Sequence, residues 1–167
     1  MKIWLIGMMG SGKTSAGEIA AGNLNVPFMD TDRIIEQRTG ESVSSFWSAN
    51  GEEAFRDVER SVVADLAGEE GIVSTGGGIV LDASNRRLLV DSGSVVWLQA
   101  RVSTLASRVA SSSDRPLLAA SEDPFDVMES KLRERAALYE AVAGYRIETD
   151  DLTPSEVAGE IEELWKS

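Results

Sequence analysis

The chain has 167 residues, of which 43% are hydrophobic, and its formal net charge is −12. A chain of this length and composition is expected to form one domain, residues 1–167, with a core that needs no covalent staple. The acidic excess argues against a nucleic-acid binder, which should show a basic face. The sequence contains no cysteine and no histidine, which excludes disulfides and thiolate zinc sites and removes the commonest general base. Any proton acceptor should therefore be a carboxylate, and any metal a hard cation bound by oxygen.

No segment has the roughly 18 consecutive apolar residues of a membrane span. The apolar run at 2–6 is too short for a signal peptide and reads as a first strand. We therefore expect a soluble, cytoplasmic protein with no membrane partner and no nucleic-acid partner.

Strand-like and helix-like segments alternate along the chain. Apolar runs predict strands at 2–6, 26–30, 72–75, 94–98 and 145–148. Helical patterns fill the intervals, at 15–22, 33–38, 44–50, 52–66, 84–91, 103–110, 124–142 and 154–166. This alternation predicts a parallel sheet with helices on both faces, and such sheets bind ligands at the carboxyl ends of their strands.

The segment 7–14, GMMGSGKT, matches the phosphate-binding P-loop pattern G-x-x-x-x-G-K-T directly after the first strand. Its glycines let backbone N–H groups approach phosphate oxygens, and a helix that follows adds the positive end of its dipole. We expect Lys13 to reach the β- and γ-phosphates and the Thr14 hydroxyl to ligate Mg²⁺. The residues predicted to hold the nucleotide here are Gly10, Ser11, Gly12, Lys13, Thr14 and Ser15.

The second strand ends in Asp30-Thr31-Asp32. If the extended geometry persists, the carboxylates of Asp30 and Asp32 point to the same side, where one can serve Mg²⁺ and the other a substrate hydroxyl. The alternative is an Asx turn that caps the next helix. The P-loop one strand away favours the functional interpretation.

The third strand ends in Gly76-Gly77-Gly78. A backbone without side chains suits close approach of a carboxylate or a phosphoryl group, although three glycines are also a permissive turn. On the helix that precedes this strand, Arg56 and Glu59 share a face. They form either a solvated ion pair or an arginine fork that binds a substrate carboxylate.

A long segment at about 111–124 carries Arg115. Long loops are usually functional or disordered, so this one is either a mobile surface loop or a lid that brings Arg115 to the transferring phosphoryl group. On the next helix Arg135 and Tyr139 share a face, a spacing that by itself favours an ordinary charged helix surface.

Taken together, these motifs resemble the shikimate kinases, within the nucleoside-monophosphate-kinase-like P-loop fold. The matching motifs occur in order along nearly the whole chain: GMMGSGKT at 7–14, DTD at 30–32, FRDVE at 55–59, GGG at 76–78, RPLL at 115–118 and RAALY at 135–139. The resemblance implies a three-layer α/β sandwich whose five-stranded parallel sheet has the order 2-3-1-4-5. It also implies an acceptor-binding region at about 31–60, a lid at about 111–124, a monomeric state and a place in aromatic amino acid biosynthesis.

The same resemblance implies a reaction and a role for each site residue. The γ-phosphoryl group of MgATP would pass to the 3-hydroxyl of shikimate, giving shikimate 3-phosphate and ADP. Asp32 would bind that hydroxyl and act as its base, Lys13 and Arg115 would stabilise the transferring group, and Asp30 would organise Mg²⁺ with Thr14. The implied shikimate-binding residues are Asp32, Arg56, Gly76, Gly77, Gly78 and Arg135. Arg108 and Pro154 match the residues that lie beside the adenine. Arg115 would also bind the nucleotide.

Two other functions stay open at this point. One is a different small-molecule kinase on the same fold, such as a gluconate kinase or a nucleoside-monophosphate kinase. Gluconate also offers a carboxylate and hydroxyls, whereas no feature of the chain supplies a pocket for a second base. The other is a metabolite-binding module without turnover, which the intact Lys13, Thr14, Asp30, Asp32 and Arg115 argue against. Production of ADP would separate these two.

Overall fold

The structure is a computed structural model of the chain and describes residues 1–110 and 123–167. Five parallel strands form one sheet in the order β2-β3-β1-β4-β5, which confirms the expected topology. The strands are β1 (Lys2–Ile6), β2 (Phe28–Asp30), β3 (Gly71–Ser74), β4 (Ser94–Gln99) and β5 (Tyr145–Glu148). The second strand is shorter than predicted because Pro27 has no N–H with which to join the ladder.

Helices occupy the intervals between the strands, as predicted. They are α1 (Lys13–Leu24), α2 (Thr31–Thr39), α3 (Val43–Leu66), α4 (Ala83–Ser92), α5 (Val102–Ala110), α6 (Pro124–Val142) and α7 (Pro154–Lys166), with a short 3₁₀ helix, η1 (Ile79–Leu81), that was not predicted. The predicted helices at 44–50 and 52–66 join end to end in α3. The break between them is Gly51, whose φ of 85° and ψ of 174° lie in a region open essentially to glycine alone.

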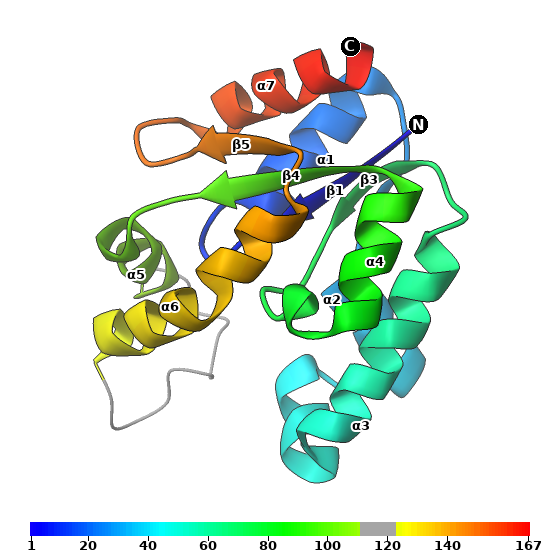
Figure 1. Ribbon diagram of the computed structural model, residues 1–167, viewed down its shortest axis with the longest axis vertical. Coiled ribbons are helices and arrows are strands. Elements are labelled where there is room, and N and C mark those ends of the chain that lie inside the picture. The colour runs from blue at the N-terminus through cyan, green and yellow to red at the C-terminus, as the bar shows by residue number, and fades with distance from the viewer. Residues whose placement is uncertain (111–122) are drawn as a thin grey trace.

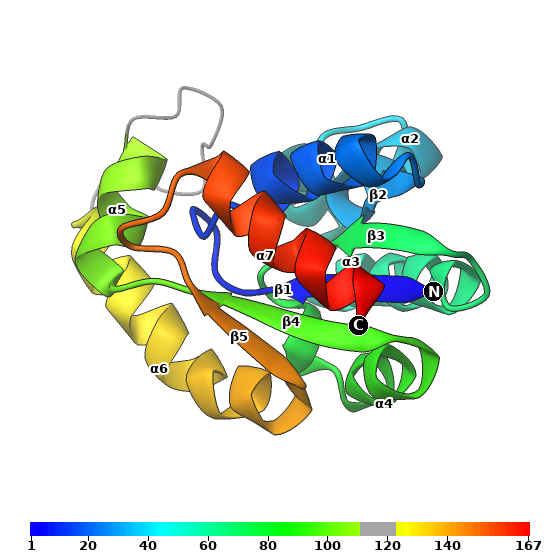
Figure 2. The same cartoon turned by 90° about the horizontal axis from the view of Figure 1, so that it is seen from above.

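The sheet lies between two layers of helices (Figures 1 and 2). Helices α1 and α7 cover one face, and α3, α4 and α6 cover the other. Side chains of β1 alternate between the two cores: Trp4 and Ile6 pack under α3, α4 and α6, whereas Ile3 and Leu5 pack under α1 and α7. The three-layer α/β sandwich expected from the sequence is therefore the observed architecture.

The parallel direction of the strands gathers three motifs at one edge of the sheet. The P-loop follows β1, the Asp30-Thr31-Asp32 segment ends β2, and the three glycines follow β3. Since carboxyl ends of parallel strands meet at the same edge, these segments become neighbours although they are far apart in the chain. Within the described ranges, 1–110 and 123–167, no helix is both long enough and apolar enough to span a membrane.

Candidate active site

The P-loop wraps around the start of α1. Gly10 and Gly12 adopt φ angles of 81° and 92°, which favour glycine, and Gly12 is the N-cap of α1. The Lys13 ammonium donates to the carbonyl oxygens of Gly7 and Met8, each at 2.9 Å. Lys13 is only 7% exposed. Its ammonium group therefore lies inside the curve of the loop, near the N-terminal end of α1.

A cluster of oxygen atoms lies beside the first turn of α1. The Thr14 hydroxyl donates to Oδ2 of Asp30 at 2.9 Å and lies 3.1 Å from Oγ of Ser74. In the described part of the chain no three His, Cys, Asp or Glu side chains gather as metal ligands. A site with a small number of protein ligands, all of them oxygen atoms, suits Mg²⁺, because this ion usually keeps several waters and phosphate oxygens in its shell.

Asp30 serves two purposes at once. While Oδ2 faces Thr14, Oδ1 accepts the N–H groups of Asp32 at 3.0 Å and Arg33 at 3.3 Å, and so caps α2. The capping interpretation is therefore confirmed. The extended geometry, which was the condition for the two carboxylates to point to the same side, does not persist to Asp32, because this cap starts a helix at Thr31. Asp30 and Asp32 nevertheless line the same cavity.

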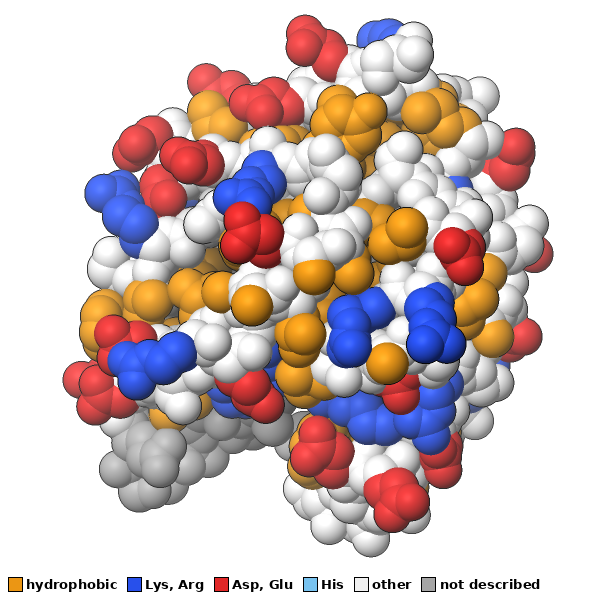
Figure 3. All heavy atoms as spheres, in the orientation of Figure 1, with side chains coloured by type: hydrophobic (Ala, Val, Ile, Leu, Met, Phe, Trp, Pro, Cys, Tyr) orange, Lys and Arg blue, Asp and Glu red, His pale blue; other side chains and the backbone are white. Residues whose placement is uncertain are grey.

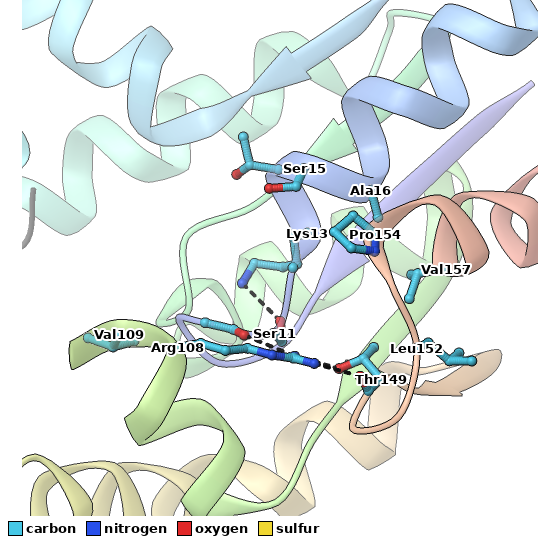
Figure 4. A pocket seen from close by; sticks show the side chains of 13 residues that line it. Ser11, Lys13, Ser15, Ala16, Arg108, Val109, Thr149, Leu152, Pro154 and Val157 are labelled. Carbon is cyan, nitrogen blue, oxygen red and sulfur yellow. Dashed lines mark hydrogen bonds between the residues drawn. The ribbon is translucent and has the colours of Figure 1, made fainter. Parts of the chain in front are cut away.

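The first of two neighbouring cavities has a volume of about 430 Å³ and opens over the P-loop (Figure 4). It is lined by residues 10–16, by Arg108 and Val109 of α5, and by Thr149, Leu152, Pro154 and Val157. The Arg108 guanidinium donates to the carbonyl oxygens of Gly10 at 3.3 Å and Thr149 at 2.6 Å, and to the Thr149 hydroxyl at 3.0 Å. Arg108 thus ties α5 to the P-loop and to the segment after β5.

Sequence reasoning identified Arg108 and Pro154 at this cavity but missed Thr149. A usable signal existed, since Thr149 directly follows β5, as the other motifs follow their strands. Leu152 and Val157 carried no comparable signal, because apolar residues in that pattern are equally typical of a helix core.

The second cavity, of about 640 Å³, lies on the other side of Lys13 and Thr14, which line both cavities. The predicted residues Asp30, Asp32 and Gly77 also line it, as does Ser74, the neighbour of the Thr14 hydroxyl. Its remaining lining residues were not singled out from the sequence: Met9, Arg33, Glu36, Ser42, Val43, Ser44 and Thr75. A group bound in one cavity therefore shares Lys13 and Thr14 with a group bound in the other.

Arg56 and Glu59 form a buried ion pair rather than a solvated one. Nη1 of Arg56 donates to Oε2 of Glu59 at 2.8 Å, and the two side chains are 12% and 1% exposed. Burial raises the pKa of Glu59, although the charge of Arg56 opposes that shift. The guanidinium also lies 5.4 Å from the ring centroids of both Trp47 and Phe55. The Arg56 side chain is thus held in one orientation.

Each of the three glycines after β3 lies next to one residue that is predicted to bind the acceptor substrate. A Cβ atom on Gly76 would lie 2.8 Å from Oδ1 of Asp32, and one on Gly78 would lie 2.5 Å from Nη2 of Arg56. A Cβ on Gly77 would lie 3.6 Å from Nη1 of Arg135. None of these three residues has a positive φ. At Gly76 and Gly78, close approach rather than an unusual turn conformation is what favours glycine, whereas a Cβ on Gly77 would make only ordinary contacts.

Arg135 and Tyr139 of α6 meet the same glycine segment from the other side. The Tyr139 hydroxyl donates to the Gly77 carbonyl oxygen, and burial raises the pKa of Tyr139 to about 12, so the hydroxyl stays protonated. The buried Nε of Arg135 has no hydrogen-bond acceptor among the described residues. The ordinary charged surface that the spacing favoured is therefore wrong for this face of α6. Neither Arg56 nor Arg135 lines the second cavity itself. Arg135 adjoins the cavity at Gly77, and Arg56 lies against Gly78, the next residue along the chain.

Basic side chains are concentrated locally despite the net charge of −12. On the face drawn in Figure 3, Lys and Arg side chains gather over α3 and α4, and Asp and Glu side chains lie both beside them and across the rest of the face. Arg115 and residues 111–122 of the expected lid lie outside the described residues.

Comparison with known proteins identifies one family. A family model for shikimate kinase matches residues 9–166. A shikimate kinase of Vibrio vulnificus is 41% identical over 160 residues, which cover 95% of this chain and 92% of that protein. One of a Sulfurihydrogenibium species is 38% identical, covering 95% of this chain and 94% of the relative.

Solved structures give the same result. Shikimate kinase from Acinetobacter baumannii in complex with shikimate has a TM-score of 0.92 at 36% identity, covering 99% of this chain and 92% of that one. The enzyme from Bacteroides thetaiotaomicron has a TM-score of 0.93 at 32% identity, covering 100% and 99%. A family match over nearly the whole chain, with relatives of this identity, shows that the chain belongs to the shikimate kinase family.

Proposed function

We propose that this protein transfers the γ-phosphoryl group of MgATP to the 3-hydroxyl of shikimate, giving shikimate 3-phosphate and ADP. As a member of the shikimate kinase family it is an ATP-dependent kinase that acts on shikimate. The observation that best supports the site is that Lys13 and Thr14 line both cavities. A nucleotide in one cavity and an acceptor in the other then meet at these two residues, where phosphoryl transfer has to occur.

On the nucleotide side, the residues are proposed to act as follows. The backbone N–H groups at 10–15 bind phosphate oxygens, and Arg108 and Pro154 border the adenine in the cavity of about 430 Å³. Lys13 stabilises the charge of the transferring group, together with Arg115. Thr14 and Asp30 would hold Mg²⁺, which neutralises phosphate charge when bound.

On the acceptor side, Asp32 binds the 3-hydroxyl and removes its proton, because the chain has no histidine to do so. Arg56 and Arg135 bind the shikimate carboxylate, with Gly76, Gly77 and Gly78 providing the space between them. Arginine suits this task, since its planar donors match a carboxylate. Catalysis by this set consists of positioning and charge stabilisation.

The wider organisation is part of the same proposal. Residues 1–167 form a single kinase domain, with an acceptor-binding region at about 31–60 and a lid at about 111–124. The protein acts as a monomer in the cytoplasm, in aromatic amino acid biosynthesis. It needs neither a nucleic acid nor a membrane, in keeping with its net charge of −12.

The testing experiment is a coupled ADP-release assay with MgATP and three acceptors: shikimate, gluconate and AMP. We expect turnover with shikimate alone. Turnover with gluconate or AMP instead would keep the P-loop assignment and discard the shikimate assignment. Binding of ATP without turnover of any acceptor would contradict the proposed reaction and favour a metabolite-binding module.

Replacement of Arg135 by alanine should raise KM for shikimate by about tenfold to a hundredfold, the effect of losing a charged hydrogen bond worth roughly 1.5–3 kcal/mol. The KM for ATP should stay the same, because Arg135 adjoins Gly77 and not the nucleotide cavity. Steady-state kinetics with each substrate varied would measure both. Arg133→Ala, an exposed arginine on the same helix, is the control. Unchanged kinetics with Arg135→Ala would remove this residue from the carboxylate clamp.

Replacement of Gly78 by alanine should raise KM for shikimate by about tenfold, equivalent to about 1.4 kcal/mol. The new methyl group would lie 2.5 Å from Nη2 of Arg56 and force the guanidinium away. The matched control is Gly22→Ala on α1, where an added Cβ meets nothing within 4 Å. Kinetics and thermal melts of both variants would show whether binding changes without loss of folding. A Gly78→Ala enzyme with wild-type KM would mean that Arg56 does not bind the acceptor in this orientation.

A further inference from the structure

Lys131 is a half-buried lysine on α6, one helical turn before Arg135. Residues four apart on a helix share a face, so Lys131 lies on the side of α6 that presents Arg135. Within residues 1–110 and 123–167, the structure records no hydrogen bond and no ion pair for its ammonium group. A partly desolvated ammonium without a hydrogen-bonded anion is unfavourable, which makes Lys131 a candidate for a binding function.

The charges around Lys131 come from two helices. On α6 they are Arg135 and Glu134, and on α3, across the glycine segment, they are Arg56 and Glu52. Burial lowers the pKa of Lys131 from its usual 10.5, and the positive charges of Arg135 and Arg56 lower it further, against the opposing effect of the two glutamates. Lys131 is thus within electrostatic range of Arg56 on α3 as well as of Arg135 on its own helix.

Three cationic side chains therefore converge from α3 and α6. Arg56 is packed against Gly78, and Arg135 against Gly77. The buried Nε of Arg135 lacks an acceptor among the described residues. Arg56 itself is paired, with Glu59 at 2.8 Å and Glu52 at 3.5 Å. The Lys131 ammonium and the buried Nε of Arg135 are thus donors that no described residue satisfies, and donors of this kind on cationic side chains suit an anionic ligand.

We propose that Lys131 is a third cation of the acceptor site, one that contacts the substrate carboxylate with Arg56 and Arg135 and so determines the preference for acidic acceptors. The inference rests on the proposed function, because it takes the Arg56 and Arg135 clamp as the carboxylate site. Lys131 would add to the carboxylate site a cation that can lose its proton, whereas an arginine stays charged at every accessible pH.

A pH dependence follows from this role. In the free enzyme Lys131 loses its proton at a lower pH than an ordinary lysine does. A bound carboxylate favours the charged form and raises the pKa, so binding takes up a proton when the lysine is partly neutral. KM for shikimate should therefore rise as the pH increases from neutral toward 10.5, the usual lysine value.

The experiment compares wild type, Lys131→Met and Lys131→Arg with the control Arg133→Met, an exposed arginine on the same helix that pairs with Glu129. At neutral pH, Lys131→Met should raise KM for shikimate about two- to fivefold, as expected for one partly exposed ion pair. It should leave kcat and KM for ATP unchanged. Lys131→Arg should keep a low KM and lose the rise at high pH.

Two further readouts distinguish this role from a structural one. Calorimetric titration with shikimate, in buffers of different ionisation enthalpy and at the pH where KM for shikimate rises, should detect proton uptake by wild type and none by Lys131→Met. With the methyl ester of shikimate, which carries no charge, wild type and Lys131→Met should have the same KM.

Failure of the inference and failure of the proposed function give different results. If wild type phosphorylates shikimate while Lys131→Met keeps its KM and its proton uptake, Lys131 has no part in binding, and the proposed function stands. If wild type binds shikimate with Lys131-dependent proton uptake but forms no ADP, the inference stands and the proposed reaction is wrong.

Discussion

Replacement of Lys13 by alanine should lower kcat by about 100- to 1,000-fold or more, the usual effect of removing one donor that stabilises transition-state charge. The Lys13 ammonium is held by the carbonyl oxygens of Gly7 and Met8, at 2.9 Å each, and its residue lines both cavities. The ammonium group is therefore placed to contact the phosphoryl group throughout its transfer from donor to acceptor. Alanine removes the charge, and no other described lysine lines either cavity.

The measurement is ADP release under saturating MgATP and shikimate, with thermal melts to confirm folding. Lys166→Ala, near the exposed end of α7, is the matched control and should behave as wild type. Because Lys13 also holds the loop together, its alanine variant is expected to bind ATP more weakly, which calorimetry would report. Wild-type turnover by a folded Lys13→Ala enzyme would contradict the assignment of segment 7–14 as the phosphate site.

Replacement of Asp32 by asparagine should lower kcat by about 100- to 10,000-fold, the range for loss of a general base. Asparagine keeps the size of the side chain, which matters because Oδ1 lies 2.8 Å from where a Cβ on Gly76 would be. It removes the negative charge that accepts the hydroxyl proton. The acceptor cavity offers Asp30 and Glu36 as other carboxylates, but Asp30 already caps α2 and accepts from Thr14.

Single-turnover kinetics at saturating shikimate would separate the chemical step from binding. The control is Asp91→Asn, an exposed position on α4. A modest loss, below about tenfold, would show that proton removal does not need Asp32 and that positioning alone accounts for catalysis.

Local patterns in the sequence were enough to predict most of the architecture. Alternating apolar strands and amphipathic helices depend on residues within one turn or one strand, so their periods are visible without coordinates. The P-loop and the two helices that meet at Gly51 were found for this reason. The strand order, by contrast, came from the family resemblance of the motifs and was then confirmed.

Errors arose where a single side chain changed the local backbone. The cap formed by Asp30 turned an expected extended segment into the first turn of α2. The proline at position 27 shortened β2 in a similar way. Both effects are encoded locally, but they compete with the strand pattern, and the sequence alone does not say which prevails.

By itself, the sequence determined the phosphate-binding loop, the class of fold and the carboxylate nature of any base, because these depend on adjacent residues and on composition. Only the tertiary structure decided that Arg56 is buried against Glu59, and that Gly76 and Gly78 give room to Asp32 and Arg56. It also decided that Lys131 lies within the field of Arg56. The physical reason is that burial and charge depend on contacts such as that of Tyr139 with Gly77, which join segments far apart in the chain and follow from packing.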